Sequence, residues 1–395
     1  MTREQLIYLD SQASTRVDDR VLEKMIPFFT EQYGNASGNH LEGQRLNSSI
    51  EGSRLQLADA FGANPDEFIF TSGATESNNL VFWAVMDFLK TAGRDRILLS
   101  AIEHKSVIEP IALLKQRGFE VDFIPVDRDG LINLDSFGQL LCPRVGLVSI
   151  VAANNEIGVI QDLEAISEVC RENDVLFHTD FAQGVGYVPL NLNSLGIAFA
   201  TFSGHKCYGP KGVGALFIAG GAKPELNSMI LGGGQEGGLR SGTLNVPGIV
   251  GFAEAVRLQV AEGQARADHV RLLVKAFLDV MLESGIRFHL NGHPSRRLPG
   301  NLNLWFEGVE AEQLMMSLPG IVISNGSACN SRALSPSHVL TAIGCDRERA
   351  FESVRISFSK DNQLDEVVHA AKQIAAKVTE LSQKIYPTPP LGANT

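Results

Sequence analysis

Cysteine and tryptophan are scarce in this chain of 395 residues, which contains five cysteines and two tryptophans. The cysteines are widely spaced, and no two of them form a Cys-x-x-Cys pair. This spacing argues against a disulfide framework and against a metal site built from cysteine. Hydrophobic residues make up 44% of the chain, so we expect two domains with a large core.

Basic charge and long apolar runs are also lacking. The formal net charge is −11, which offers no basic stripe along which a nucleic acid could bind directly. No apolar run approaches the roughly 18 residues needed to cross a membrane. The first residues carry no signal-peptide pattern. We therefore expect a cytoplasmic protein that contacts neither membranes nor free nucleic acid.

One lysine has unusual surroundings. Lys206 ends the segment Thr201-Phe-Ser-Gly-His-Lys206, and a glycine-rich turn with an apolar run follows it. A buried lysine loses its proton readily and then attacks carbonyl carbon. Pyridoxal 5'-phosphate (PLP) is the cofactor that becomes covalently attached to such an amine. A lysine that merely closes a loop would also fit this segment taken alone.

A cofactor of this kind needs an acidic partner for its pyridine nitrogen. The apolar run 175–177 predicts a buried strand of a parallel sheet, and polar residues follow where ligands bind in such sheets. Asp180 would keep the ring nitrogen protonated, which makes the ring an electron sink. Gln183 could donate to the ring hydroxyl. The competing interpretation is that Asp180 caps the next helix.

The phosphate needs a cradle of hydrogen-bond donors. A predicted strand at 68–70 runs into Thr71-Ser-Gly-Ala-Thr-Glu, and apolar spacing predicts that a helix follows. The start of that helix presents free backbone N–H groups and the positive end of a dipole, and Thr75 adds a hydroxyl. An N-cap with nothing bound would produce the same pattern.

The order of elements indicates an α/β fold. Between about 67 and 217, short apolar runs alternate with helical stretches, which predicts βαβ units and a mainly parallel sheet. Residues 246–284 read as long helices that connect two domains. The remaining predicted strands are 7–9, 287–290, 301–305 and 354–358, and the remaining predicted helices are 20–29, 41–61, 310–318, 336–343 and 363–385. We place Leu46, Ile50, Leu55 and Ala58 on the apolar side of helix 41–61.

Together these segments resemble the cysteine desulfurases, the NifS/IscS-type PLP enzymes of fold type I within the class-V aminotransferase family. The resemblance runs in the family's order from Tyr8-Leu-Asp10 to about Arg355-Ile-Ser-Phe358. Further motifs that carry it are Asn154-Asn-Glu-Ile-Gly, His178-Thr-Asp-Phe-Ala-Gln, Gly233-Gly-Gln-Glu and Arg240-Ser-Gly-Thr243.

The segment Ser324-Asn-Gly-Ser-Ala-Cys329-Asn-Ser resembles the longer catalytic-cysteine loop of the class I branch. Its small and polar residues suit an accessible, reactive thiol. Without the resemblance, Cys329 could equally be an incidental loop cysteine.

The resemblance implies the PLP-transferase fold, which is like that of aspartate aminotransferase. A large PLP-binding domain would span 15–260. A smaller α+β domain, formed by 1–14 and 261–395, would carry the cysteine loop at about 322–334. The large domain would contain the mainly parallel sheet.

The resemblance also implies an activity, the conversion of L-cysteine to L-alanine with the sulfur held as a persulfide on Cys329. Lys206 would hold PLP and take the substrate's Cα proton, and His104 would stack on the ring and shuttle protons. Arg355 would bind the substrate carboxylate, with Asn155 between that carboxylate and the ring hydroxyl.

By the same resemblance, the phosphate would be bound by Ala74, Thr75, Ser203 and His205, and by Thr243 of a neighbouring subunit. A homodimer is thus expected. The resemblance leaves the role of His40 open.

The sequence leaves the sulfur acceptor open. An acceptor protein, either a scaffold for iron–sulfur cluster assembly or an enzyme that thiolates tRNA or DNA, would fit. A selenocysteine lyase or another fold type I enzyme related to aminotransferases would need Lys206 and Asp180 but not Cys329. A non-catalytic partner in a sulfur-transfer complex would need only the fold.

Four departures from the family pattern stand out. Phe181 replaces a usual alanine, and we expect its ring to pack inward, away from the cofactor. Gly237 replaces an arginine, Ala198 replaces an aspartate, and the carboxyl-terminal extension is short and rich in proline.

Overall fold

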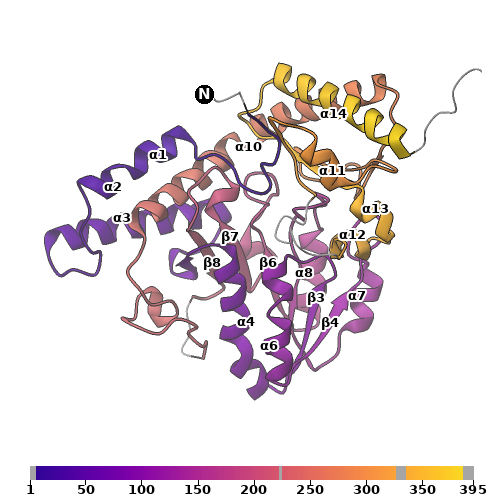
Figure 1. Cartoon of the computed structure of the whole chain (residues 1–395). Helices are drawn as coiled ribbons and strands as arrows, with labels where there is room; N and C mark the ends of the chain where they lie inside the picture. Colours follow the sequence, from indigo (N-terminus) through magenta and orange to yellow (C-terminus); the bar gives the residue numbers. More distant parts are fainter. Residues whose placement is uncertain (1–5, 222–224, 326–334, 386–395) are drawn as a thin grey trace, which may run out of the picture.

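A seven-stranded sheet forms the centre of the computed structural model, which describes residues 6–221, 225–325 and 335–385 (Figure 1). Strand β8 runs antiparallel to β2 and β7, while the other neighbouring pairs are parallel. The prediction of a mainly parallel sheet is therefore confirmed. In spatial order the strands are β2 (Phe68–Thr71), β8 (Gly214–Ile218), β7 (Phe199–Ser203), β6 (Leu176–Asp180), β5 (Val145–Ser149), β3 (Arg96–Ser100) and β4 (Glu120–Ile124).

Helices cover both faces of this sheet, because its central strands are apolar on both sides. Along β2, Phe68 and Phe70 face one hydrophobic cluster, while Ile69 faces another that includes Leu80 and Val85 of α4. The helices between the strands are α4 (Ala74–Thr91), α5 (Lys105–Ile108), α6 (Ile111–Gln116), α7 (Leu134–Leu140), α8 (Leu163–Glu172) and α9 (Leu192–Leu195).

Three helices precede the sheet. The single helix predicted at 20–29 is instead two helices, α1 (Asp19–Met25) and α2 (Pro27–Thr30), with Pro27 opening the second. Helix α3 (Leu41–Phe61) has the predicted bounds, but the placement of Leu55 on its apolar side is wrong, since Leu55 is 49% exposed. Leu55 lies nine positions after buried Leu46, which at about 100° per residue puts Leu55 on the opposite face of the helix.

One helix of 38 residues, α10 (Val246–Glu283), replaces the several helices predicted at 246–284. Its length is about 57 Å at 1.5 Å per residue. Its first half, from Val246 to Leu258, packs in the cluster beside the sheet. Its second half contributes Val270, Phe277 and other residues to a separate cluster. Helix α10 therefore joins the two hydrophobic cores.

The second core lies around two small sheets. Strand β1 (Ile7–Tyr8) pairs in parallel with β11 (Ile321–Val322), so the first described strand joins a segment more than 300 residues later in the sequence. The strand predicted at 287–290 is limited to His289–Leu290, and the helix α13 (Arg347–Phe351) was not predicted. The antiparallel sheet contains β12 (Ser353–Ser357), β10 (Asn301–Trp305) and β9 (His289–Leu290). The helices are α11 (Ala311–Met316), α12 (His338–Ala342), α13 (Arg347–Phe351) and α14 (Leu364–Ile385).

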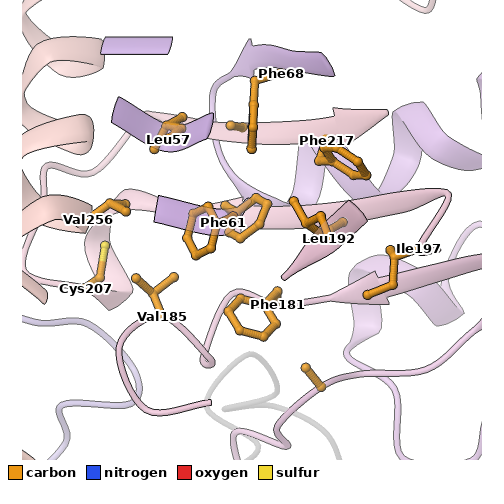
Figure 2. Packing of buried hydrophobic residues seen from close by; sticks show 14 of the residues in the cluster. Leu57, Phe61, Phe68, Phe181, Val185, Leu192, Ile197, Cys207, Phe217 and Val256 are labelled. Atoms are coloured by element: carbon orange, nitrogen blue, oxygen red, sulfur yellow. The ribbon is translucent and has the colours of Figure 1, made fainter. Parts of the chain in front are cut away.

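Phe181 packs inward, as predicted. Its ring is fully buried and lies edge-on to Phe61, with ring centroids 6.1 Å apart (Figure 2). It also lies edge-on to Phe202, at 5.6 Å between centroids. A Cβ at Gly184 would lie 2.6 Å from the Phe181 ring. Glycine at position 184 therefore provides the space that the phenylalanine ring occupies.

Phe181→Ala should lower the free energy of unfolding by about 3–5 kcal/mol, because it leaves a cavity among packed aromatic rings. Urea unfolding followed by fluorescence measures the change. Phe88→Ala is the matched control, since Phe88 is 43% exposed, and it should cost less than about 1 kcal/mol. Equal losses in the two variants would contradict this account of Phe181.

Candidate active site

A cavity of about 430 Å³ lies at the carboxyl edge of the large sheet. Asp180 and Ser203 are the last residues of β6 and β7, and the cavity also receives residues from the segments that follow β2, β3 and β5. This is where open α/β sheets bind their ligands. Nine of the predicted residues line it: Ala74, Thr75, His104, Asn155, Asp180, Gln183, Ser203, His205 and Lys206.

The other predicted residues lie elsewhere. Thr243 is exposed and does not line this cavity. Arg355 lies behind the cavity wall, where its Nη1 donates to the backbone carbonyl of Asn155 over 3.0 Å. Cys329 lies outside the described residues. His40 has a local role, since its Nδ1 caps helix α3 by accepting from the Gly43 N–H.

Lys206 ends a short 3-10 turn, Gly204–Lys206, that directly follows β7. Its Nζ donates to the carbonyl oxygens of Gln12 and Ala13 over 2.5 and 3.0 Å. The side chain of Gln183 donates to the same Gln12 carbonyl over 2.9 Å. The amine is thus positioned by the N-terminal segment at one border of the cavity.

Asp180 is 5% exposed and is held by two donors. One oxygen accepts from the Ala182 N–H over 3.0 Å, and the other accepts from the Asn78 side-chain amide over 2.7 Å. The next helix, α9, begins at Leu192 and is capped by Asn191. Asp180 therefore caps no helix, and its carboxylate faces the cavity.

Asn78 extends this contact into a relay. Its amide nitrogen also lies 2.8 Å from the Ser106 hydroxyl, and that hydroxyl lies 2.8 Å from His104 Nδ1. The Ser106 backbone N–H donates to the same Nδ1 over 3.1 Å. Because Nδ1 accepts a hydrogen bond, the neutral imidazole of His104 carries its proton on Nε2. Two side chains, those of Asn78 and Ser106, thus connect Asp180 to His104.

Burial is the main cause that lowers the pKa of His104 below its usual 6.5. The positive charges of Lys206 and Lys105 act in the same direction, while Asp180 opposes them. The imidazole is therefore neutral at pH 7, as a residue that exchanges protons there requires.

The opposite end of the cavity suits an anion. Gly73, the N-cap of α4, makes no side-chain cap, and the first helical hydrogen bond comes from the Ser77 N–H. The N–H groups of Ala74, Thr75 and Glu76 precede that bond, so no helical carbonyl takes them. Burial lowers the pKa of nearby His205 to about 4, which leaves its ring neutral and able to donate.

A carboxylate near this anion site is neutralised. Glu76 accepts from the Ser72 N–H over 2.9 Å and from Arg240 Nε over 2.8 Å. Burial opposes its ionisation, but these donors lower the pKa of Glu76 overall. Its negative charge is thus balanced by the guanidinium of Arg240.

Arg355 is 2% exposed and sits on β12. Its Nη2 bonds to Asp10 over 2.6 Å, while its buried Nε finds no partner among the described residues. A buried donor without a partner is rare in proteins and marks a place where another acceptor can bind. The guanidinium therefore retains one donor that no described residue satisfies.

Sequence reasoning missed the residues that hold these groups in place. Asn78, Gln12 and Asp10 lie within or beside the motifs quoted above, and Ser106 lies two residues after His104; this proximity was the available signal. Their type gave no indication, because polar residues in such segments are usually solvated.

Comparison with known proteins decides the family. The aminotransferase class-V family model matches residues 7–369. Cysteine desulfurase IscS of Rickettsia typhi is 41% identical over 382 residues, which cover 96% of this chain and 93% of the relative. The chain belongs to the cysteine desulfurases. This family is PLP-dependent, and the prediction of a fold type I desulfurase is confirmed.

Solved structures agree. A NifS-like protein superimposes with a TM-score of 0.88 at 37% identity and covers 95% of this chain and 100% of its own. SspA in complex with cysteine gives a TM-score of 0.79 at 35% identity, covering 90% of this desulfurase and 99% of SspA. Within residues 6–221, 225–325 and 335–385, no helix is long and apolar enough to span a membrane.

Asn78→Ala should reduce kcat/KM for the desulfurase by about 10–100-fold, because it removes a hydrogen bond of about 1.5–3 kcal/mol to a charged group. It should also weaken PLP binding, which absorbance titration measures. Asn173→Ala is the matched control, since the exposed Asn173 side chain donates only to the Val169 carbonyl of α8, the helix that it ends. Unchanged kinetics in Asn78→Ala would show that the hydrogen bonds from Asp180 to His104 do not contribute to catalysis.

Proposed function

We propose that this protein converts L-cysteine to L-alanine, stores the sulfur as a persulfide on Cys329 and passes it to an acceptor protein. The observation that carries the proposal is the common cavity of Lys206, Asp180 and His104. A nucleophilic amine, a buried carboxylate and a neutral imidazole in one cavity suit proton transfer at a carbon next to an amine.

The residues present fit PLP. The free N–H groups at the start of α4, with Thr75, Ser203 and neutral His205, would hold its phosphate. Asp180 would pair with the pyridine nitrogen, Gln183 with the ring hydroxyl, and His104 with the ring face. When bound, PLP supplies an electron sink that weakens bonds at the substrate's Cα and Cβ.

The chain's own residues perform the remaining tasks. Lys206 would hold the cofactor through its amine. Once the substrate has displaced Lys206 from the cofactor, the free amine would accept the substrate's Cα proton, and the carbonyls of Gln12 and Ala13 would orient the amine. His104 would donate or accept through Nε2. The free donor of Arg355 would bind the substrate carboxylate, with Asn155 beside it.

The sulfur step uses Cys329. Its thiolate would attack the substrate sulfur, so that an S–S bond forms while the substrate C–S bond breaks. The electron pair of that bond passes to the organic product, which takes up protons and leaves as alanine. Overall, cysteine and the enzyme thiol give alanine and an enzyme persulfide, without an external oxidant or reductant.

The test is incubation of the PLP-loaded protein with L-cysteine and a thiol reductant. We expect sulfide and alanine in equal amounts, and Cys329→Ser should lower both by at least about 100-fold while the absorbance of bound PLP remains. Lys206→Ala should lose that absorbance band as well as the activity. A wild type that releases no alanine would contradict the proposal.

Cys142→Ser is the matched control for this test. The Arg144 N–H, followed by the Arg96 guanidinium, lowers the pKa of the Cys142 thiol, which makes it a competing thiolate among the described cysteines. Its replacement should leave sulfide release unchanged. Loss of activity in Cys142→Ser but not in Cys329→Ser would show that Cys142 carries the persulfide and would contradict the proposed role of Cys329.

A homodimer completes the proposed site. Thr243 is exposed and does not line its own chain's cavity, which supports a contact with the phosphate of a second copy. We also propose the domain division 15–260 and 1–14 plus 261–395, which follows the two cores joined by α10.

Sedimentation velocity should give the PLP-loaded protein a mass of twice 42.8 kDa. Thr243→Ala should keep that mass and weaken PLP binding by about 10-fold, as loss of one charge-assisted hydrogen bond predicts. A monomeric, fully active protein would exclude a shared site.

The acidic character of the chain supports an acceptor protein rather than a free nucleic acid. A scaffold for iron–sulfur cluster assembly and an enzyme that thiolates tRNA or DNA both have the required thiol or cluster chemistry. Both acceptors are consistent with action in the cytoplasm.

A further inference from the structure

Two sets of hydrogen bonds flank the segment that contains Cys329. Before it, Ser324 and Arg355 exchange backbone hydrogen bonds, with N···O distances of 3.1 and 2.5 Å. After it, the Ser337 hydroxyl donates to Glu156 Oε2 over 2.5 Å. Both flanks are therefore tied to residues that belong to, or adjoin, the proposed binding site for the substrate carboxylate.

Glu156 is the residue where these ties meet. Its side chain is buried and holds Ser337, and its backbone carbonyl accepts from the Asn301 and Asn303 side chains over 3.2 Å each. The preceding residue, Asn155, accepts from Arg355. Glu156 thus connects α12, strand β10 and the substrate-binding segment.

Apolar packing makes this junction rigid. Val339 and Leu340 of α12 are buried against Ile102, Val151 and Ile157, in a cluster separate from the two main cores. In addition, His338 Nε2 donates to the Glu103 carbonyl over 2.8 Å. Helix α12 is therefore fixed to the segments that carry His104 and Asn155.

The chemistry of the contact requires an acceptor at position 156, not a charge. Burial raises the pKa of the Glu156 carboxyl, against the hydrogen bond from Ser337 and the charge of Arg355. Ionised and neutral carboxyl groups both accept from a hydroxyl, and so does the oxygen of a glutamine amide.

We propose that Glu156 is a positioning residue for sulfur transfer: by holding Ser337, it sets where the Cys329 segment ends relative to a substrate bound by Arg355 and Asn155. The inference rests on the proposed function. Ser337 lies eight positions after Cys329, a stretch that can span at most about 27 Å, so the position of Ser337 limits how far Cys329 can lie from this anchor. A shift of about 1 Å in such an anchor can cost about 100-fold in rate.

Glu156→Ala should slow persulfide formation on Cys329 by about 10–100-fold in a single turnover, measured by mass spectrometry after rapid quench. Exchange of the L-alanine Cα proton with D2O needs Lys206 and PLP but no thiol. It should therefore stay within about threefold of wild type, because orientation of that carbon is unchanged. Glu156→Gln should restore persulfide formation.

Hydrogen–deuterium exchange gives a readout independent of activity. Amides of α12 should exchange faster in Glu156→Ala than in wild type and Glu156→Gln. Ser337→Ala removes the same contact from the other side and should reproduce both effects. Asp346→Ala is the matched control, since Asp346 caps α13 by accepting from the Arg349 N–H and has no contact with Glu156.

The inference is overturned if Glu156→Ala lowers the rates of proton exchange and persulfide formation equally. It is also overturned if Glu156→Gln forms the persulfide as slowly as Glu156→Ala, or if Asp346→Ala slows persulfide formation as much as Glu156→Ala does. It is equally overturned if Glu156→Ala keeps the wild-type rate. A wild type that forms no persulfide refutes the proposed function instead, so the two failures are distinct.

Discussion

The hydrogen bond from Asn78 to Asp180 links helix α4 to the end of strand β6, and the geometry of the active site depends on it. A buried carboxylate is stable only when donors replace the water it has lost. Asn78 lies one helical turn after Ala74, whose N–H faces the anion end of the cavity. A single rigid helix therefore provides the donors at the phosphate end and fixes the carboxylate at the ring end.

Other carboxylates near the cavity are paired with arginine side chains. Glu76 is paired with Arg240, and Arg355 with Asp10. A third, fully buried pair joins Arg54 of α3 to Glu236, which also accepts from the Phe70 N–H of β2. These pairs leave Asp180 as a carboxylate held by neutral donors alone, so its charge remains available to a cationic ligand group.

The buried pair also explains one departure from the family pattern. To bring its carboxylate to Arg54, Glu236 adopts a positive φ of 50°, and Gly237 and Gly238 follow with φ of 63° and 81°. Three consecutive left-handed residues are strained for any side chain with a Cβ. Glycine at 237 thus fits the local backbone.

Sequence patterns predicted those elements whose signals are local. Helix α3 lies between a capping His40 and Gly62, which has the left-handed conformation typical of a helix end, so its bounds were predictable. Leu55 was misplaced because hydrophobic character was read without its angular position. The pairing of β1 with β11 joins residues more than 300 positions apart, and no local pattern encodes such a contact.

The residues of the site also fall into those with a local sequence signal and those that depend on distant contacts. Lys206 and Asp180 could be proposed from their surroundings and His104 from the family resemblance, and the structure brings all three to one cavity. Asn78 and Glu156 could not be proposed in this way, since their importance arises only when the fold removes them from water and gives each a distant partner. In the proposed mechanism, the residues around the ring lie at the end of the large sheet, whereas Arg355 lies on β12 beside the second core. Ser337 caps α12, which packs in the separate cluster, so the hydrogen bonds of Glu156 join this helix to β10 of the second core.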